Sequence, residues 1–238
     1  MANGYQYENK PRNIFRFGLA LWRLVRDPEN TKEAGVVELT FNRSRWGKKL
    51  ARWDRVAQEL VQDYPQLAPV VAARKRLARV DLDALIALPP NTLGHTLAKL
   101  EMQRGIDPNL VDPLPDNDDG EWLVAHLYET HDFWHVLTGF AFNEEGEYGV
   151  AGVYLGQLRN ATFFAFMLSI VLAKTVWKDG DQLGKQFRAL VEGYQIGQRS
   201  LPMVGLDWSQ LWHRDLEELR RELNITEAGR IDQTALAA

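Results

Sequence analysis

The stretch EWLVAHLYETHDFWHVLTGF, residues 121–140, decides the fold. Its apolar residues recur every three or four positions, which is the period of an α-helix. No segment alternates apolar and polar residues between hairpin turns, which is the pattern of paired strands. We therefore predict an all-α protein, a helical bundle of about eight helices with no significant β-sheet. The other predicted helices cover residues 14–26, 46–62, 67–77, 81–88, 91–103, 144–177, 182–200 and 209–223.

The chain has 238 residues, a length that suits one large domain or two small ones. We predict a single domain over residues 1–227 and a flexible C-terminal tail over 228–238, where small and polar residues dominate. The clear loop is GIDPNLVDPLPDNDDG at 105–120, with three prolines and five aspartates.

Composition excludes several classes of function. The chain has 28 Lys and Arg against 32 Asp and Glu, and its net charge of −4 does not favour nucleic acid as a partner. It contains no cysteine, which removes disulfides, thiol nucleophiles, iron–sulfur clusters and thiolate zinc sites. Any bound metal must therefore be held by His, Asp or Glu.

Two stretches bear on where the protein works. The N-terminus MANGYQYENKPRN is polar and lacks the apolar run of a secretory signal, so we expect a cytoplasmic protein. The most apolar stretch, ATFFAFMLSIVLA at 161–173, is shorter than the about 20 residues that span a membrane. It is predicted to be a buried core helix or the floor of an apolar pocket.

Two histidines stand in a spacing that suits a metal ion. His131 and His135 are four residues apart, so on a helix both imidazoles lie on one face. Glu147 follows after eleven residues and a turn-prone stretch at 143–146, so the next helix can present it as a third ligand. Asp132 points about 100° away from His131, and it either reaches the ion or orients an imidazole. The pair alone also suits two half-buried polar residues without a metal.

Three motifs, in order along the chain, resemble the coenzyme Q (ubiquinone) biosynthesis protein 4 family. The first is LPPNTLG at 88–94, similar to the family's Leu-Pro-x-x-Thr-x-Gly segment. The second is the zinc-type motif His-Asp-x-x-His at 131–135, completed by Glu147. The third is WSQLWHRDLEELRRELNI at 208–225, similar to the family's C-terminal signature.

The resemblance implies metal ligands and a reaction. The ligands and catalytic residues would be His131, Asp132, His135 and Glu147, with Zn²⁺ as the expected ion. The implied reaction is an oxidative decarboxylation that replaces the carboxyl at ring carbon one of a polyprenyl hydroxybenzoate-type intermediate with a hydroxyl.

The resemblance also implies partners and a place. The partners would be an isoprenoid lipid or quinone intermediate, other enzymes of quinone biosynthesis and the surface of the inner membrane, to which the protein would attach peripherally. We also expect a homodimer. Gly152 and Gly156 then have two interpretations: close helix packing, or the wall of a channel for a polyprenyl tail.

Two alternatives to a metal-dependent decarboxylase stay open. The first is a non-catalytic scaffold that binds isoprenoids or quinones, with a structural metal closed by four protein ligands. The second is a metal phosphohydrolase, which is less favoured because His95, His126 and His213 do not supply the further ligands it needs.

Overall fold

A computed structural model describes residues 51–77, 79–105, 107–109, 116–158 and 180–225, with the single positions 22, 23, 37, 40, 41, 44, 47, 49, 114, 162, 165, 168, 169, 172, 175 and 176. Over these residues every regular element is helical, and the one β contact is an isolated antiparallel bridge between Thr92 and Asp215. The all-α prediction is confirmed. The predicted helix at 14–26 lies outside the described residues, except for helical positions 22 and 23, and so does the predicted tail at 228–238.

The described helices have clear bounds and lie close to the predicted ones. In chain order they are α4 (Trp53–Asp63), the short 3₁₀ turn η1 (Pro65–Leu67), α5 (Ala68–Ala73), α6 (Leu82–Ile86), α7 (Leu93–Arg104), α8 (Asp119–Thr138), α9 (Glu144–Gln157), η2 (Gly180–Gln182), α11 (Leu183–Arg199), η3 (Trp208–Gln210) and α12 (Leu216–Glu222).

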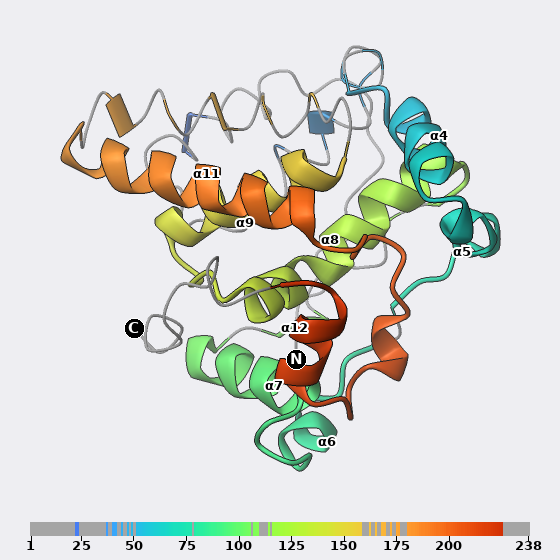
Figure 1. Ribbon diagram of the computed structural model, residues 1–238, viewed down its shortest axis with the longest axis vertical. Coiled ribbons are helices and arrows are strands. Elements are labelled where there is room, and N and C mark those ends of the chain that lie inside the picture. Colours follow the sequence, from blue (N-terminus) through green and yellow to red (C-terminus); the bar gives the residue numbers. More distant parts are fainter. Residues whose placement is uncertain are drawn as a thin grey trace.

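Helix α8 crosses the centre of the molecule and contacts α4, α5, α7, α9 and α12 (Figure 1). It begins where the side chain of Asp118 accepts a hydrogen bond from the N–H of Glu121, a standard helix N-cap. Most of its large apolar residues are buried, including Trp122 and Trp134 at 0% exposure. The core of the protein is therefore built around the helix that carries the two histidines of the predicted site.

Helices α9 and α11 lie side by side and run in the same direction (Figure 1). Their backbones touch through glycines: a Cβ atom on Gly193 would lie 1.9 Å from the carbonyl oxygen of Gly149, and one on Gly197 would lie 2.4 Å from that of Val153. A Cβ on Gly152 would lie 2.3 Å from the carbonyl oxygen of Leu190. Gly152 and Gly156 therefore serve close helix packing, the first of their two interpretations.

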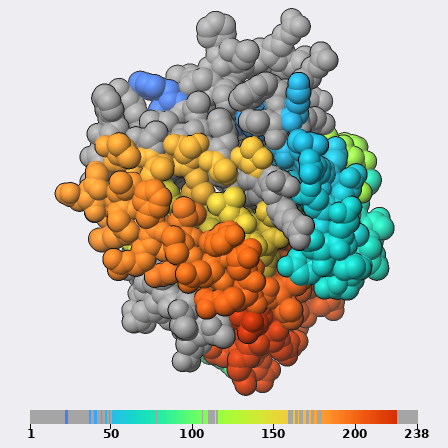
Figure 2. Space-filling view, turned by 45° about the horizontal axis from the view of Figure 1, so that its top comes forward, coloured from blue at the N-terminus to red at the C-terminus, as the bar shows by residue number. Residues whose placement is uncertain are grey.

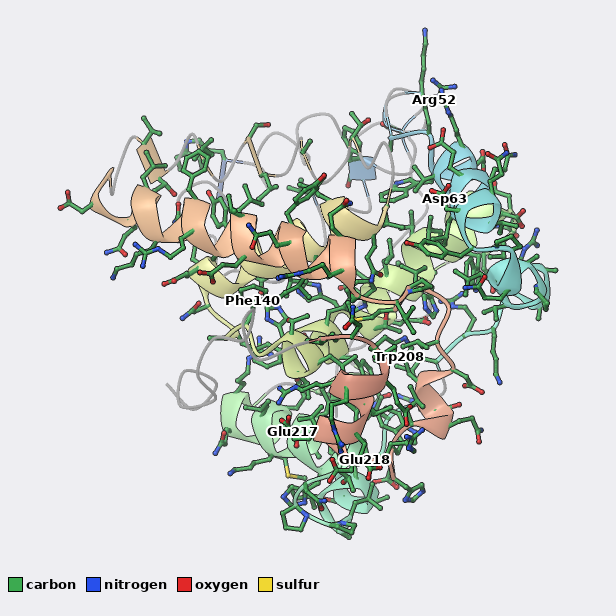
Figure 3. The ribbon with its side chains drawn as sticks, in the orientation of Figure 1. Arg52, Asp63, Phe140, Trp208, Glu217 and Glu218 are labelled. Carbon is green, nitrogen blue, oxygen red and sulfur yellow. The ribbon has the colours of Figure 1, made fainter. Side chains whose placement is uncertain are left out.

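The C-terminal segment returns to the start of α7. The N–H groups of Leu93 and Gly94 donate to the carbonyls of Arg214 and Trp212, each at 3.0 Å. These bonds hold the segment before Asp215 in a non-helical conformation, so the predicted helix at 209–223 begins only at Leu216, where Asp215 caps it. Figure 3 labels Glu217 and Glu218 on α12, beside α7.

Two other predicted helices are interrupted. The predicted helix at 144–177 breaks after Gln157, because Leu158 takes an extended backbone (φ −106°, ψ 112°) with its side chain buried in the core. The backbone is helical again at position 162 and at the later described positions up to 176. The predicted helix at 46–62 is broken at Arg52, which has a left-handed backbone (φ 50°), so α4 begins at Trp53.

Over the part of the chain that the structure describes, no helix is both long enough and apolar enough to cross a bilayer. Most of the apolar stretch 161–173 lies outside that part.

Candidate metal centre

A short turn brings the two histidines of α8 to the glutamate of α9. Helix α8 is capped at its C-terminal end by Gly139, whose positive φ of 81° suits glycine and whose N–H donates to the carbonyl of His135. Asn143 then caps α9 by accepting a hydrogen bond from the N–H of Gly146. A Cβ on Gly146 would lie 1.7 Å from the carbonyl oxygen of Ala141, so only glycine allows this turn to close. Glu147 follows in the first turn of α9 and faces back toward α8.

Three predicted ligands converge in space. The His131 Nε2 atom lies 3.2 Å from His135 Nε2 and 3.1 Å from Glu147 Oε2, and His135 Nε2 lies 3.3 Å from Glu147 Oε1. The ligand atoms of a tetrahedral Zn²⁺ with bonds of 2.0–2.1 Å are about 3.3 Å apart. Within the described residues, no other group of three or more His, Asp or Glu side chains could hold an ion. The three donors therefore fit a divalent metal in chemistry and in spacing.

The outer nitrogens of both imidazoles have partners. The Nδ1 atom of His135 lies 3.1 Å from the carbonyl oxygen of Phe140, which is labelled in Figure 3. A carbonyl only accepts hydrogen bonds, so Nδ1 carries the proton and Nε2 offers its lone pair. The Nδ1 atom of His131 lies 3.1 Å from the hydroxyl of Tyr154. Both rings are therefore held with Nε2 directed at Glu147.

The site reaches from the core to solvent. The side chain of His135 is fully buried, that of His131 is 33% exposed and that of Glu147 is 50% exposed. Desolvation acts to raise the pKa of Glu147, but without a metal the positive charges of protonated His135 and His131 and their hydrogen bonds to the carboxylate outweigh it and hold the pKa well below the ordinary 4.5. The carboxylate is thus ionised over the range in which a metal would bind.

Asp132, the fourth predicted ligand, does not join this group. Its Oδ1 atom lies 4.0 Å from Nη1 of Arg104 at the end of α7, on the neighbouring side of α8. Arg104 Nη1 also donates to Glu101 Oε1 at 3.2 Å. Burial and the charge of Asp132 raise the pKa of Glu101 to about 8, although Arg104 acts to lower it.

The C-terminal segment supports the end of α8. Arg220 on α12 is fully buried, and its guanidinium donates to the carbonyls of Leu137 and Val136 at 2.9 and 2.8 Å. Glu217 pairs with the same guanidinium through Nη1. These are carbonyls of the last turn of α8, which have no partner within the helix, so Arg220 stabilises the helix end next to His135.

The remaining histidines lie apart from the centre. His126 is buried, and its Nε2 accepts a hydrogen bond of 3.1 Å from the N–H of Gly205. Burial, together with the charge of Arg76, lowers the pKa of His126 to about 4. The Nδ1 atom of His95 faces the carbonyls of Ile86 and Leu88. Neither histidine lies in the group formed by His131, His135 and Glu147.

Sequence reasoning missed Tyr154 and Phe142, two residues next to the ligands. Tyr154 follows Glu147 by seven positions, so a helical spacing places both on one face of α9, and this signal could have found it. Phe142 stacks on the ring of His135, with centroids 4.4 Å apart and planes 24° apart. Its place depends on the turn between α8 and α9, which periodicity does not describe.

Fold and site together define an all-α protein with a candidate metal centre of two histidines and one glutamate on consecutive helices. The model of the coenzyme Q (ubiquinone) biosynthesis protein Coq4 family matches residues 53–229. The chain belongs to this family, and the family resemblance is confirmed.

Individual relatives give the same result. The chain is 26% identical over 174 residues to the mitochondrial ubiquinone biosynthesis protein COQ4 of Clavispora lusitaniae, covering 72% of this chain and 51% of that protein. It is 30% identical over 154 residues to the mitochondrial COQ4 homolog of Aedes aegypti, covering 61% of this chain and 53% of that protein. The chain thus spans about half the length of the curated relatives it matches.

A solved structure has the same fold. A protein of Nostoc punctiforme PCC 73102 assigned to ubiquinone biosynthesis matches with a TM-score of 0.71 over 91% of this chain and 100% of that one. The sequence identity is 24%, so this likeness concerns the fold alone.

Proposed function

We propose that the protein is a metal-dependent enzyme of ubiquinone or prenylquinone biosynthesis. Its reaction is the oxidative decarboxylation at ring carbon one of a polyprenyl hydroxybenzoate-type intermediate. The observation that carries the proposal is the convergence of His131, His135 and Glu147, with inter-ligand distances of 3.1 to 3.3 Å, in a chain of the Coq4 family.

The number of ligands favours a catalytic over a structural metal. Structural zinc sites are closed by four protein ligands, whereas catalytic sites keep a position for substrate or water. Three side chains meet here, and Asp132 is directed at Arg104 instead. The exposure of His131 and Glu147 leaves this position open to a substrate that arrives from solvent.

The residues of the site prepare it for an anionic substrate. A bound divalent ion would supply a positive centre that stabilises charge on a ring carboxylate or phenolate as the carboxyl leaves. The carbonyl of Phe140 and the hydroxyl of Tyr154 fix the two imidazoles, so the ligand set needs little rearrangement. Replacing the ring carboxyl with a hydroxyl releases CO2 and is a two-electron oxidation, for which we take dioxygen as the oxidant. Zn²⁺ has no redox chemistry and would leave the electron transfer to the electron-rich ring, whereas a redox-active native ion would relay electrons to dioxygen.

Metal content and turnover test this proposal together. Purified protein is expected to retain about one divalent ion per chain, measured by mass spectrometry. It should also convert a prenylated hydroxybenzoate to the product in which a hydroxyl replaces the ring carboxyl. His131→Ala, His135→Ala and Glu147→Ala should lose both metal and turnover. His213→Ala, which changes an exposed histidine away from the site, is the matched control and should retain both. Full metal occupancy and activity in any of the three ligand variants contradicts the proposal.

Two further results separate the alternatives. Asp132→Ala should keep the metal, because the aspartate lies outside the ligand group; loss of the metal would make Asp132 a fourth ligand and favour a structural site. Metal and a co-purified isoprenoid without any turnover would favour the scaffold.

The proposal includes peripheral attachment to a membrane, and an exposed face of α11 supports it. Phe187, Val191 and Tyr194 recur at helical spacing and are 45%, 51% and 47% exposed. Helix α11, orange in Figure 2, runs along the surface of the molecule, and Arg188 lies beside these residues on the same helix. Val191→Asp should reduce sedimentation with anionic vesicles, whereas Gln58→Asp, the same change of charge at an exposed position of α4, should reduce it much less. Equal binding by both variants would exclude this face.

A further inference from the structure

Arg104 lies beside the metal centre, separated from it by one aromatic ring. Its guanidinium carbon is 4.1 Å from the ring centre of Phe142, and the same ring stacks on His135. Its Nη1 atom lies 4.0 Å from Asp132, the neighbour of His131 in α8. Arg104 closes α7, so three chain segments place this cation next to the ligands: the end of α7, the middle of α8 and the turn before α9.

Part of the Arg104 guanidinium has no hydrogen-bond partner among the described residues. Both carboxylates near it, Glu101 and Asp132, face the same atom, Nη1. Its Nε and Nη2 groups bond to none of the described residues, and the side chain is 27% exposed. An anion can therefore approach the Nε–Nη2 edge, which is the edge that binds a carboxylate with two parallel hydrogen bonds.

The guanidinium is also held in place before a ligand arrives. Glu101 is fully buried and anchors Nη1, and the face of Phe142 attracts the cation. A side chain that is already ordered loses less conformational entropy on binding than a free surface arginine. Asp132, His131 and Glu147 are likewise part exposed, so a ligand can reach Arg104 and the metal centre from one side.

We propose that Arg104 binds the carboxylate of an aromatic hydroxy acid whose ring lies at the His131–His135–Glu147 centre. This inference rests on the proposed function, because it assigns a contact to the substrate of that centre. Arg104 is thereby a specificity-determining residue: it selects ring acids over neutral phenols and sets which end of the ring faces the metal.

The test uses two ligands that differ by one group. They are 3-geranyl-4-hydroxybenzoate and 2-geranylphenol, which lacks only the carboxylate, and calorimetry measures their binding to the zinc-loaded full chain. Arg104→Gln should weaken binding of the acid about tenfold or more and leave binding of the phenol unchanged. Arg104→Lys keeps the positive charge but cannot form two parallel hydrogen bonds to a carboxylate, so its affinity for the acid should lie between those of the wild type and Arg104→Gln. Arg55→Gln, a surface arginine paired with Glu59, is the control and should bind both as the wild type does.

Several results would overturn the inference. The Arg104→Gln variant could keep the wild-type preference for the acid, or it could lose affinity for both ligands equally, which is the mark of a purely structural residue. Wild-type protein that binds neither ligand also overturns it. The His135→Ala variant tests the proposed function separately: if it binds both ligands as the wild type does, the metal centre is not the binding site, whatever Arg104 does.

Discussion

The two faces of α9 are built in different ways. Toward α11 the helix presents glycines, and backbone touches backbone with no room for a methyl group. Toward α8 it presents Glu147 and Tyr154, long polar side chains that meet two histidines at the edge of solvent. On the first face the backbone contact fixes the position of α9 against α11. On the second face the distances between Glu147 and the two histidines suit a metal ion only if α9 is placed to within a few tenths of an ångström. The comparison indicates that the glycine contact fixes the helix whose other face supplies Glu147 to the candidate metal centre.

The largest expected effect is that of Gly193→Ala. The new Cβ would lie 1.9 Å from the carbonyl oxygen of Gly149, so the two helix backbones must separate. We expect the free energy of unfolding in urea to fall by about 3 kcal/mol or more. Zn²⁺ affinity should fall as well, because α9 moves with its ligand. A loss below about 1 kcal/mol would show that the contact tolerates a side chain.

The comparison extends along α8, where the buried His126 contrasts with the part-exposed His131. Below pH 6.5 the unfolded chain takes up a proton on His126, whereas the folded chain does so only near pH 4. The unfolded state binds more protons in this window, so stability falls as the pH drops through it. The full effect is about 3 kcal/mol, and it vanishes above pH 6.5, where both states are neutral. In urea unfolding of the metal-free protein at several pH values, the free energy of unfolding of His126→Gln should depend less on pH than that of the wild type. Parallel curves for the two proteins would refute this account.

Tyr154→Phe should affect only the face of α9 that is directed at α8, and so should change metal binding more than stability. It removes the hydroxyl that contacts His131 Nδ1 at 3.1 Å and keeps the ring that packs on Trp134. Partners of this kind change metal affinity about 10–100-fold, so we expect Zn²⁺ to bind at least about tenfold more weakly in a competition titration. The free energy of unfolding without metal should change by no more than about 1 kcal/mol. Unchanged Zn²⁺ affinity would show that His131 needs no outer partner.

Gly184→Ala should have the smallest effect and the opposite sign. Gly184 lies in the first turn of α11, and a Cβ there would meet nothing within 4 Å. Alanine favours the helix, so the variant should gain about 0.5 kcal/mol in urea unfolding. It is the matched control for Gly193→Ala on the same helix. A loss of stability in Gly184→Ala would mean that steric overlap is not what makes glycine substitutions in α11 destabilising.

Periodicity predicted the helices, and the four-residue spacing predicted that His131 and His135 lie together on one face of α8. Both are local properties of the chain. The breaks were not predictable in this way: Leu158 interrupts an apolar run that continues on both sides, and the segment before Leu216 is held by bonds to residues more than a hundred positions away. The motif predicted Asp132 as a ligand, but in the structure its carboxylate faces Arg104, which comes from another helix. Arg104 itself stands in no pattern that points to the histidines. The single domain, the homodimer and the zinc ion stay predictions.

The buried guanidinium of Arg220 has a consequence for how the protein is made. Ribosomes deliver the chain from its N-terminus, so all three candidate ligands emerge well before residue 220. Until then the final carbonyls of α8 have no cap from Arg220, and residues 91–94, at the start of α7 and just before it, lack their bonds to residues 212–216. The centre therefore reaches its final form only after the C-terminal segment has docked. Nascent chains released before that residue should bind metal poorly, even though they contain every ligand.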